Sequence, residues 1–453
     1  MMSFIDAIYK QGGQVFEVGG AVRDELWGIP HKDKDLLVTK IPFPKLVEIL
    51  KSQGKVLEVG KSFGVLKFRP RHQQVEYDIA LPRTEKSTGQ GHRDFEVDFD
   101  ENIPLELDLK RRDFTINAIA REITTHKLID PYGGQEDLKN KVLRQVFPEC
   151  FVEDPLRLMR AVQFAARFEL QIEEKTLSAM KREALQIKTV SPERIIEEIS
   201  KLLKAKVPSQ GFALMRETGI LPHVFPELSA LTNRSDKKQK SPNVFEHSLR
   251  TLDYARQGAN LENSGHPELL LASLFYESGQ AVLDKAEDFS KPEVRKQIQE
   301  ISAKLTKNWL QRYRASMLGI EEKRVVQLVK FHRFEIKNLT TDAALRRFIY
   351  QIGKDVVDLW LDLEIADRQD ASDAHELQEI LRLKKSIEAL LAQKPPLSLQ
   401  ELAIDGNGLM KAGYPEGPLL GKILHASLEE VLERPEKNTR EALEAFISEH
   451  FPK

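Results

Sequence analysis

A change of hydrophobic pattern near residue 140 constrains the fold of this chain more than any other feature. Before it, Gly and Pro separate short strand-like runs: VFEV, DLLV, KVLEVG, GVLKFR and VEYDIAL, then INAIAREI and HKLIDP. After it, apolar residues recur every three or four positions, as in RLMRAVQFAARF, ERIIEEISKLLKA, LVKFHRF and HELQEILRLKKSIEALLA. The pattern predicts an α+β chain, in which a mixed α/β domain precedes a helical array, and 453 residues suffice for roughly three domains.

The segment EVGGAVRDELWGIPHKDKDLLV carries the first candidate site. Gly19 and Gly20 lie between a strand-like and a helix-like run, where backbone N–H groups can face an anion, and Arg23 follows one turn later to bind phosphate. In an extended strand Asp33 and Asp35 point to the same side, and two carboxylates with substrate phosphates commonly hold Mg²⁺. The segment predicts a nucleoside triphosphate site. The alternatives are an ordinary Gly-Gly turn and two solvated aspartates.

The cluster RRDFTINAIA offers a second set of nucleotide-binding side chains. Arg111 and Arg112 could bind phosphates. Asp113 could accept a hydrogen bond from a ribose 2′-OH, and Asn117 is assigned to the same nucleotide-binding group. Asp113 and Thr115 also have the chemistry of a helix N-cap, and the cluster taken alone favours capping.

The segment EDPLRLMRAVQFAARF predicts a helix with one polar face. Asp154 suits the N-cap and Pro155 the first helical position, while Arg157 and Arg160 follow at steps of three on the same face. If Asp154 accepts and Arg157 donates, the pair matches the amino group and ring nitrogen of cytosine or adenine. Guanine and uracil would leave a group unmatched, at a cost of roughly 1–3 kcal/mol. The alternative, an intrahelical ion pair worth about 0.2–0.5 kcal/mol, is favoured by this segment alone.

Charge is distributed unevenly along the helical part. The whole chain has a formal charge of -2, which gives no global sign of nucleic-acid binding. Residues 291–347, however, carry 14 Lys or Arg against 6 Asp or Glu, so a phosphate backbone could bind there. The alternative is a solvated helix face. The residues expected to bind RNA are Arg312, Arg314, Lys323 and Arg324.

Cysteine content and hydropathy indicate the compartment. Cys150 is the single cysteine, which excludes an internal disulfide framework and suits a reducing cytosol. The sequence shows neither a signal peptide nor a run of about 18 apolar residues. We therefore expect a soluble cytoplasmic protein without a membrane partner, in which the cysteine is inert.

In order and spacing, five motifs resemble those of the bacterial class II tRNA nucleotidyltransferase and poly(A) polymerase family. They are GGAVRD with Asp33 and Asp35, RRDFTINA, DPYGGQEDL, EDPLRLMRAVQFAARF and SPERIIEEI. The resemblance is dense over residues 13–205 and traceable further through VFEHSL and LAIDGNGLMKAGYPEGPLLGKIL. It implies a polymerase-β-like catalytic head at 1–140, a helical neck with the nucleobase-selecting motif at 141–225, and a tRNA-binding body and tail at 226–345 and 346–453.

Carried over residue by residue, the resemblance implies these roles. Asp33 and Asp35 are catalytic and hold Mg²⁺, and Asp78 in VEYDIAL matches an acidic position of relatives, which makes it a candidate third metal ligand. Asp154 and Arg157 bind the incoming base. The other residues expected to bind nucleotide are Gly19, Gly20, Arg23, Arg111, Arg112, Asp113, Asn117 and Arg160.

The activity implied by the resemblance is template-independent addition of C, C and A to tRNA. The 3′-hydroxyl of tRNA would attack the α-phosphate of CTP or ATP, and pyrophosphate would leave. A substantial loop between Arg83 and the second motif favours complete CCA addition over addition of C or A alone. The terminal FISEHFPK is not an arginine-rich extension, so poly(A) polymerase is the second interpretation.

Two departures from the family pattern limit this transfer of roles. His247 looks like the first ligand of the HD phosphohydrolase that some relatives contain, but Tyr276 and Glu277 stand where its His-Asp pair should follow. We therefore expect that activity to be absent and His247 to be structural. Gln163 stands where relatives usually have arginine. A non-catalytic RNA-binding protein and a phosphohydrolase with a vestigial head are the remaining alternatives.

Overall fold

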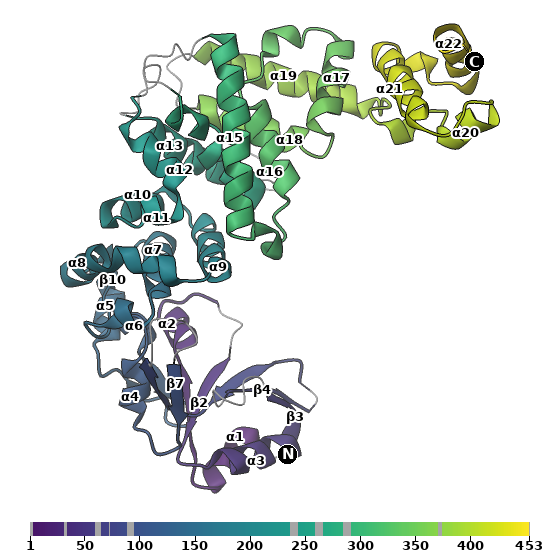
Figure 1. The fold of residues 1–453 in the computed structure, drawn as a ribbon. Coiled ribbons are helices and arrows are strands. Elements are labelled where there is room, and N and C mark those ends of the chain that lie inside the picture. Colours follow the sequence, from purple (N-terminus) through teal and green to yellow (C-terminus); the bar gives the residue numbers. More distant parts are fainter. Residues whose placement is uncertain are drawn as a thin grey trace. The chain divides into compact units, whose positions relative to one another are not determined.

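The computed structural model describes most of the chain (Figure 1). It forms two compact units, Met1–Val224 and Phe225–Lys453. No helix in the described ranges is long and apolar enough to cross a membrane. The described residues are 3–30, 34–58, 65–71, 73–87, 95–235, 243–258, 266–283, 291–369 and 374–452.

A seven-stranded mixed sheet forms the centre of the first unit, in the order β3-β4-β5-β2-β1-β8-β9. β2 and β5 run parallel, and the other neighbours run antiparallel. The strands are β1 Gln14–Val18, β2 Asp35–Thr39, β3 Gly54–Glu58, β4 Val65–Pro70, β5 Tyr77–Ala80, β8 Ala120–Glu122 and β9 Leu128–Ile129. Two smaller pairs are β6 Arg83–Ser87 with β7 Phe95–Phe99, and β10 Val142–Leu143 with β11 Gln171–Ile172.

Alternation along the strands supplies apolar side chains to both faces of the sheet. Val15 and Val38 belong to a core with α1 (Phe4–Lys10) and α3 (Phe43–Gln53). Phe16 and Leu37, their neighbours in the chain, belong to a second core with α4 (Leu105–Lys110). Apolar side chains therefore line both faces of the sheet at β1 and β2.

Helices make up the rest of the first unit. α7 carries ten buried residues out of thirteen and packs on α9 and α10, as its apolar spacing predicts. α9 begins with Ser191 and Pro192, the residue types favoured at a helix start. The remaining bounds are α2 Gly20–Leu26, α5 Gly134–Lys139, α6 Cys150–Glu153, α7 Leu156–Phe168, α8 Glu174–Glu183, α9 Pro192–Leu203, α10 Ser209–Thr218 and α11 Leu221–Val224.

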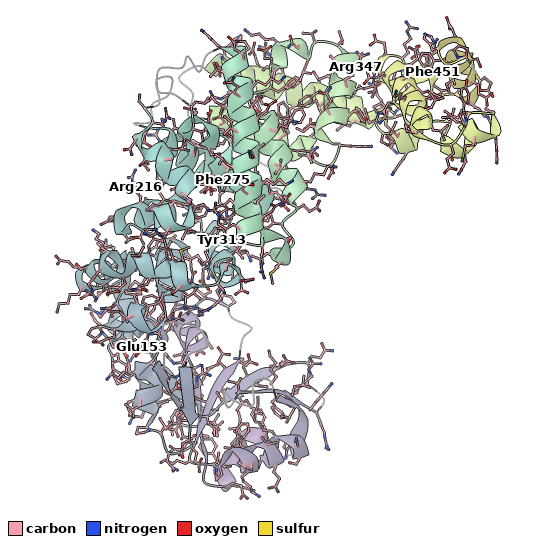
Figure 2. The ribbon with its side chains drawn as sticks, viewed as in Figure 1. Glu153, Arg216, Phe275, Tyr313, Arg347 and Phe451 are labelled. Atoms are coloured by element: carbon pink, nitrogen blue, oxygen red, sulfur yellow. The ribbon has the colours of Figure 1, made fainter. Side chains whose placement is uncertain are left out.

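The second unit is helical throughout its described residues. Its core includes Trp309, whose ring stacks on Phe225 at 4.8 Å and contacts Phe275 and Tyr313, both labelled in Figure 2. The α-helices are α12 Pro226–Ser229, α13 Val244–Gln257, α14 Pro267–Phe275, α15 Pro292–Arg312, α16 Glu322–Phe331, α17 Asp342–Ile352, α18 Val357–Arg368, α19 Ala374–Ala392, α20 Gly406–Lys411, α21 Pro418–Glu433 and α22 Arg440–His450. Short 3₁₀ helices are η2 Thr115–Asn117 and η3 Ala184–Thr189 in the first unit, and η4 Ala230–Asn233, η5 Ser278–Ala281, η6 Ala315–Leu318, η7 Ile336–Asn338, η8 Leu399–Glu401 and η9 Pro435–Lys437 in the second.

The predicted α+β architecture is confirmed, and two local predictions are wrong. INAIAREI is not one strand, because η2 occupies its start and β8 begins at Ala120. The side chain of Thr115 donates to Asp137 at 2.6 Å, which fixes a tight turn instead of an extended chain. LVKFHRF is helical as far as Phe331, because His332 (ψ 137°) and Arg333 (φ 52°) both leave the right-handed helical conformation.

Candidate functional site

An acidic pair lies on the face of the sheet opposite the core with α1 and α3. Asp35 begins β2, and its register partner in the parallel strand β5 is Asp78. Their neighbours Leu36 and Ile79 are also register partners and point into the core with α1 and α3. The structure therefore brings together two of the three predicted carboxylates, while Asp33 lies outside the described residues.

A cavity of about 690 Å³ opens beside this pair. Two carboxylates facing one cavity are oxygen ligands of the kind that Mg²⁺ takes, so the donor set fits this ion. No group of three or more His, Cys, Asp or Glu suited to a metal occurs among the residues that the structure describes. The cavity is lined by Lys34, Asp35, Lys67, Gln74, Val75, Glu76 and Asp78.

The glycine turn forms as the sequence predicts. Gly19 has φ 71° and ψ -132°, between β1 and α2. A Cβ at Gly19 would lie 2.5 Å from Nη1 of Arg112, so the guanidinium lies directly against the bare backbone. Nε of Arg112 is buried and has no hydrogen-bond partner in the described structure. Arg112 and Arg111 both pair with Asp108, at 3.4 and 2.9 Å.

A buried polar chain connects the glycine turn to α7. Nη1 of Arg23 donates to Oδ1 of Asn117 at 2.7 Å, and Nδ2 of Asn117 donates to Oδ1 of Asp113 at 2.9 Å. On the other carboxylate oxygen, Nε and Nη2 of Arg160 lie at 2.7 and 2.6 Å. Burial raises the pKa of Asp113, but the charge of Arg160 and the bond from Asn117 outweigh it and hold that pKa below its usual value. The chain joins three separate sequence motifs.

Asp113 does not cap a helix, so this interpretation is wrong. Phe114 is the N-cap residue of η2, and no side chain caps that turn. The carboxylate instead accepts from the backbone N–H of Phe114 at 2.8 Å, in addition to Asn117 and Arg160. Both of its oxygens are thus bound within the protein.

The start of α7 differs in part from the prediction. Oδ1 of Asp154 accepts from the backbone N–H of Leu156 at 3.2 Å, as a capping side chain does, although Pro155 itself is the assigned N-cap residue. The predicted alternative of an intrahelical Asp154–Arg157 pair is wrong, because the carboxylate of Asp154 binds both Nη atoms of Arg194 on α9 at 3.2 and 2.9 Å. Sequence reasoning missed Arg194, since 40 residues separate it from its partner.

Arg157 points into the protein. It is 8% exposed, and its guanidinium donates to the carbonyl oxygens of Arg111 at 2.6 Å and Cys150 at 3.2 Å. Glu153, labelled in Figure 2, lies 3.7 Å away. Burial raises the pKa of the Cys150 thiol to about 12. Arg157 therefore ties α7 to the RRDF segment in this structure.

The expected RNA-binding residues have mixed surroundings. Arg312 pairs with Glu227 at 2.9 Å, and Arg324 pairs with Asp355 at 3.0 Å. Arg314 adopts φ 51°, and Lys323 is exposed. Part of the local positive charge is thus balanced inside the second unit.

His247 belongs to a buried cluster around Asp367. Nε2 of His247 lies 2.8 Å from Oδ1 of Asp367, and the hydroxyl of Tyr276 donates to the same oxygen at 3.0 Å. Nε of Arg333 donates to Oδ2 at 3.0 Å, and His332 lies 3.3 Å from that oxygen. Burial raises the pKa of Asp367, but Arg333 and His332 outweigh it and hold that pKa well below its usual value. The carboxylate is fully occupied by protein donors.

The other departure from the family pattern, Gln163, is also internal. It is 1% exposed, and its Oε1 accepts from Nη1 of Arg167 at 3.1 Å. The contact lies within α7, away from Asp154.

Three family descriptions match successive parts of the chain. "Poly A polymerase head domain" matches residues 15–144, and "Probable RNA and SrmB- binding site of polymerase A" matches residues 169–231. A third description, tRNA nucleotidyltransferase domain 2, matches residues 297–447. The three matching descriptions, all of polymerase or nucleotidyltransferase domains, therefore follow one another along the chain.

Curated relatives match about half of the chain. The Multifunctional CCA protein of Nitrosococcus oceani is 39% identical over 246 residues, which are 53% of this chain and 58% of that protein. The protein of the same name from Burkholderia cenocepacia is 38% identical over 258 residues, 54% of this chain and 60% of that protein. The match thus spans less than two thirds of these relatives' length.

Solved structures share the fold over nearly the whole chain. The Thermotoga maritima CCA-adding enzyme, complexed with tRNA, aligns with a TM-score of 0.59 and 22% identity over 98% of this chain and 93% of that chain. The Bacillus stearothermophilus CCA-adding enzyme, in complex with CTP, aligns with a TM-score of 0.63 and 22% identity over 98% and 95%.

Proposed function

We propose that the chain is a CCA-adding tRNA nucleotidyltransferase, because poly(A) polymerase and tRNA nucleotidyltransferase domain descriptions match three successive parts of it, and curated relatives are named Multifunctional CCA protein. It would add C, C and A from CTP and ATP to the 3′ end of tRNA in the cytoplasm and release pyrophosphate. The observation that carries the proposal is that Asp35 and Asp78 are register partners on neighbouring strands and line the same cavity. Both residues lie within the part of the chain that matches a poly(A) polymerase head domain.

Asp35 and Asp78, with Asp33, would hold Mg²⁺. The ion would neutralise charge on the triphosphate and lower the pKa of the attacking hydroxyl. The 3′-hydroxyl of tRNA attacks the α-phosphate directly, so no protein nucleophile is needed. The contribution of the protein is to orient the two reactants. The position of Asp35 and Asp78 on rigid neighbouring strands supports this role.

The glycine turn and its arginine would bind the triphosphate. A Cβ at Gly20 would meet Nη2 of Arg23 at 3.6 Å, and a Cβ at Gly19 would meet the guanidinium of Arg112, whose buried Nε has no hydrogen-bond partner in the described structure. A guanidinium in this position can donate to phosphate oxygens. Arg23 would take part through the buried chain, since it holds Asn117 in place. The ribose contact of Asp113 stays a prediction. Each oxygen of this carboxylate already accepts hydrogen bonds within the protein, so a ribose hydroxyl would have to share one of them.

Asp154 and Arg157 would select the base. Arg194 fixes the carboxylate of Asp154. Arg157 would have to exchange its carbonyl partners for the base, so base binding and local rearrangement of α7 would occur together. Cytosine and adenine satisfy an acceptor beside a donor, whereas guanine and uracil do not.

The helical parts would hold tRNA by shape and backbone charge. We retain the division into a head at 1–140, a neck at 141–225, a body at 226–345 and a tail at 346–453. In the body, exposed Lys323 is the simplest candidate for a phosphate contact, because Arg312 and Arg324 already pair with carboxylates.

Phosphohydrolase activity would be absent from the body. Arg333 places a guanidinium against Asp367 at 3.0 Å and within 3.9 Å of Glu277, so a fixed positive charge lies where a metal would need these carboxylates. Its backbone at φ 52° is one that L residues rarely adopt, and it brings the side chain to this position.

The test supplies Mg²⁺ and each nucleoside triphosphate separately to tRNA transcripts that end before, within or just short of CCA. We expect C and then A to be added at the matching ends, and G or U to be rejected. The Asp35→Asn variant should lose addition but keep tRNA binding, whereas Glu48→Gln, at an exposed carboxylate on α3, should retain both. Equal use of all four nucleotides would refute the base-selecting role. A long A tail on unrelated RNA would favour poly(A) polymerase, and addition that stops after C or needs a CC end would favour a partial enzyme.

A further inference from the structure

Three strands place charged residues in one row on the face of the sheet opposite the core with α1 and α3. Asp35 on β2 is the register partner of Asp78 on β5, and Asp78 is the register partner of Lys67 on β4. The row next to it, Leu36, Ile79 and Leu66, is buried. Because side chains alternate along strands, Asp35, Asp78 and Lys67 share the opposite face and line the same cavity.

Two carboxylates directly opposite each other on neighbouring strands repel one another. In this structure the ammonium of Lys67 lies 3.2 Å from Oδ1 of Asp78 and 3.4 Å from Oε1 of Glu76. Hydrogen bonding and the charge of Asp78 raise the pKa of Lys67. Lys34 also lines the cavity, but its ammonium pairs with Glu17 at 3.5 Å. Lys67 is thus a cation in direct contact with Asp78 of this row.

We propose that Lys67 is the resident counter-ion of the Asp35–Asp78 row, and that its ammonium leaves Asp78 when a divalent cation binds there. This inference rests on the proposed function. The carboxylate oxygens of Asp78 cannot serve the ammonium and the cation equally, so the two compete. Once released, the ammonium remains on the wall of the cavity, where it can meet a phosphate of the incoming triphosphate. Lys67 is therefore a positioning residue for the metal site.

Arg69 provides a matched control on the same strand. It lies two residues from Lys67, carries the same charge, and pairs with Glu76 at 3.3 Å. Its register partner on β3 is Lys55, and no contact of Arg69 with Asp78 is recorded in the described structure. Loss of Arg69 changes the general field of the cavity without freeing Asp78.

The experiment measures Mn²⁺ binding to the full-length protein by electron paramagnetic resonance of the free ion. Lys67→Met should bind Mn²⁺ about two- to fivefold more tightly than the wild type, as expected for removal of a solvent-exposed ion pair. Lys67→Arg, which keeps the charge, should bind like the wild type. Arg69→Met should change the affinity by less than Lys67→Met does.

Each outcome distinguishes the two proposals. If the wild type shows no Mn²⁺ binding that Asp35→Ala removes, the proposed function fails at its metal site. If that binding is present, but Lys67→Met binds no more tightly than the wild type or than Arg69→Met, the role of Lys67 is refuted. Circular dichroism of each variant checks folding, and Lys67→Gln, which also removes the charge and should also bind Mn²⁺ more tightly than the wild type, tests the role if Lys67→Met misfolds.

Discussion

The buried pair of Asp113 and Arg160 should stabilise the first unit through direct coupling. Asp113 is 6% exposed, and two donors of Arg160 reach its Oδ2 at 2.7 and 2.6 Å. Breaking a buried ion pair costs about 3–5 kcal/mol. Because 31% of the Arg160 side chain is exposed, water can solvate part of its charge once Asp113 is neutralised. We therefore expect Asp113→Asn to lower the free energy of unfolding by about 2–3 kcal/mol.

A double-mutant cycle measures this coupling. Asp113→Asn, Arg160→Met and the double variant would be compared by urea unfolding, followed through hydrogen exchange of peptides from α7. We expect the double variant to be more stable than the sum of the single effects predicts, by about 2 kcal/mol. A coupling free energy below about 0.5 kcal/mol, the usual value for independent sites, would refute the reasoning.

The dependence of stability on pH gives a second check of the Asp113–Arg160 pair, because the direction of the change follows from the pKa of Asp113. The pKa of Asp113 is lowered in the folded protein, relative to about 3.9 in an unfolded chain. The pair therefore contributes its full stability above pH about 4 and loses it as the pH falls through the folded-state pKa. The stability difference between wild type and Asp113→Asn should shrink in that acidic range. A difference that stays constant down to pH about 2 would contradict this account.

Three further outcomes follow from the contacts. Gly19→Ala should weaken CTP binding and lower the free energy of unfolding by about 1–2 kcal/mol, because φ is 71° and the new Cβ would lie 2.5 Å from Nη1 of Arg112. An unchanged calorimetric affinity for CTP together with an unchanged melting temperature would contradict this. The Cys150 thiol, with a pKa of about 12, should resist iodoacetamide at pH 8 until urea unfolds the protein, so rapid labelling of the native state would argue against its burial. Arg333→Ala should lower the melting temperature of the body, and guanidinium at low millimolar concentration should restore it more than sodium does, because Asp367 loses its buried counter-ion; equal effects of the two cations would rule out this role.

The spacing of apolar residues predicted those strands and helices whose conformation depends on neighbouring residues in the sequence. Strands β1 to β5 and helix α7 follow from alternation and from three- and four-residue spacing. The error at INAIAREI arose because Asp137, some twenty residues away, accepts a hydrogen bond from Thr115 and fixes a turn. The error at LVKFHRF arose because Arg333 leaves the helix to reach Asp367 on α18. Neither partner is visible in a local window.

The sequence indicated which residue types belong to the candidate site, but it did not indicate which residues they contact in the fold. Instead of pairing with each other, Asp154 binds Arg194 and Arg157 binds main-chain oxygens, while their contact with a base stays a prediction. A helical wheel places side chains on a face but does not identify the neighbouring helix. Lys67 lay in a predicted strand, but its pairing with Asp78 depends on the strand order of the sheet, which alternation along single strands does not determine.

The two parts of the site differ in solvent exposure, and this difference separates stability from chemistry. In the Asp35–Asp78 row the side chains of Asp78 and Lys67 are 46% and 40% exposed, so their charges can exchange partners at small cost. The chain from Arg23 through Asn117 and Asp113 to Arg160 is largely buried, and each member uses its hydrogen-bonding groups within the protein. Removing a member leaves a buried polar group unpaired, which costs more than the bond contributes. Changes in the exposed row should therefore alter ion and nucleotide binding in a folded protein, whereas changes in the buried chain should lower the stability of the first unit as well.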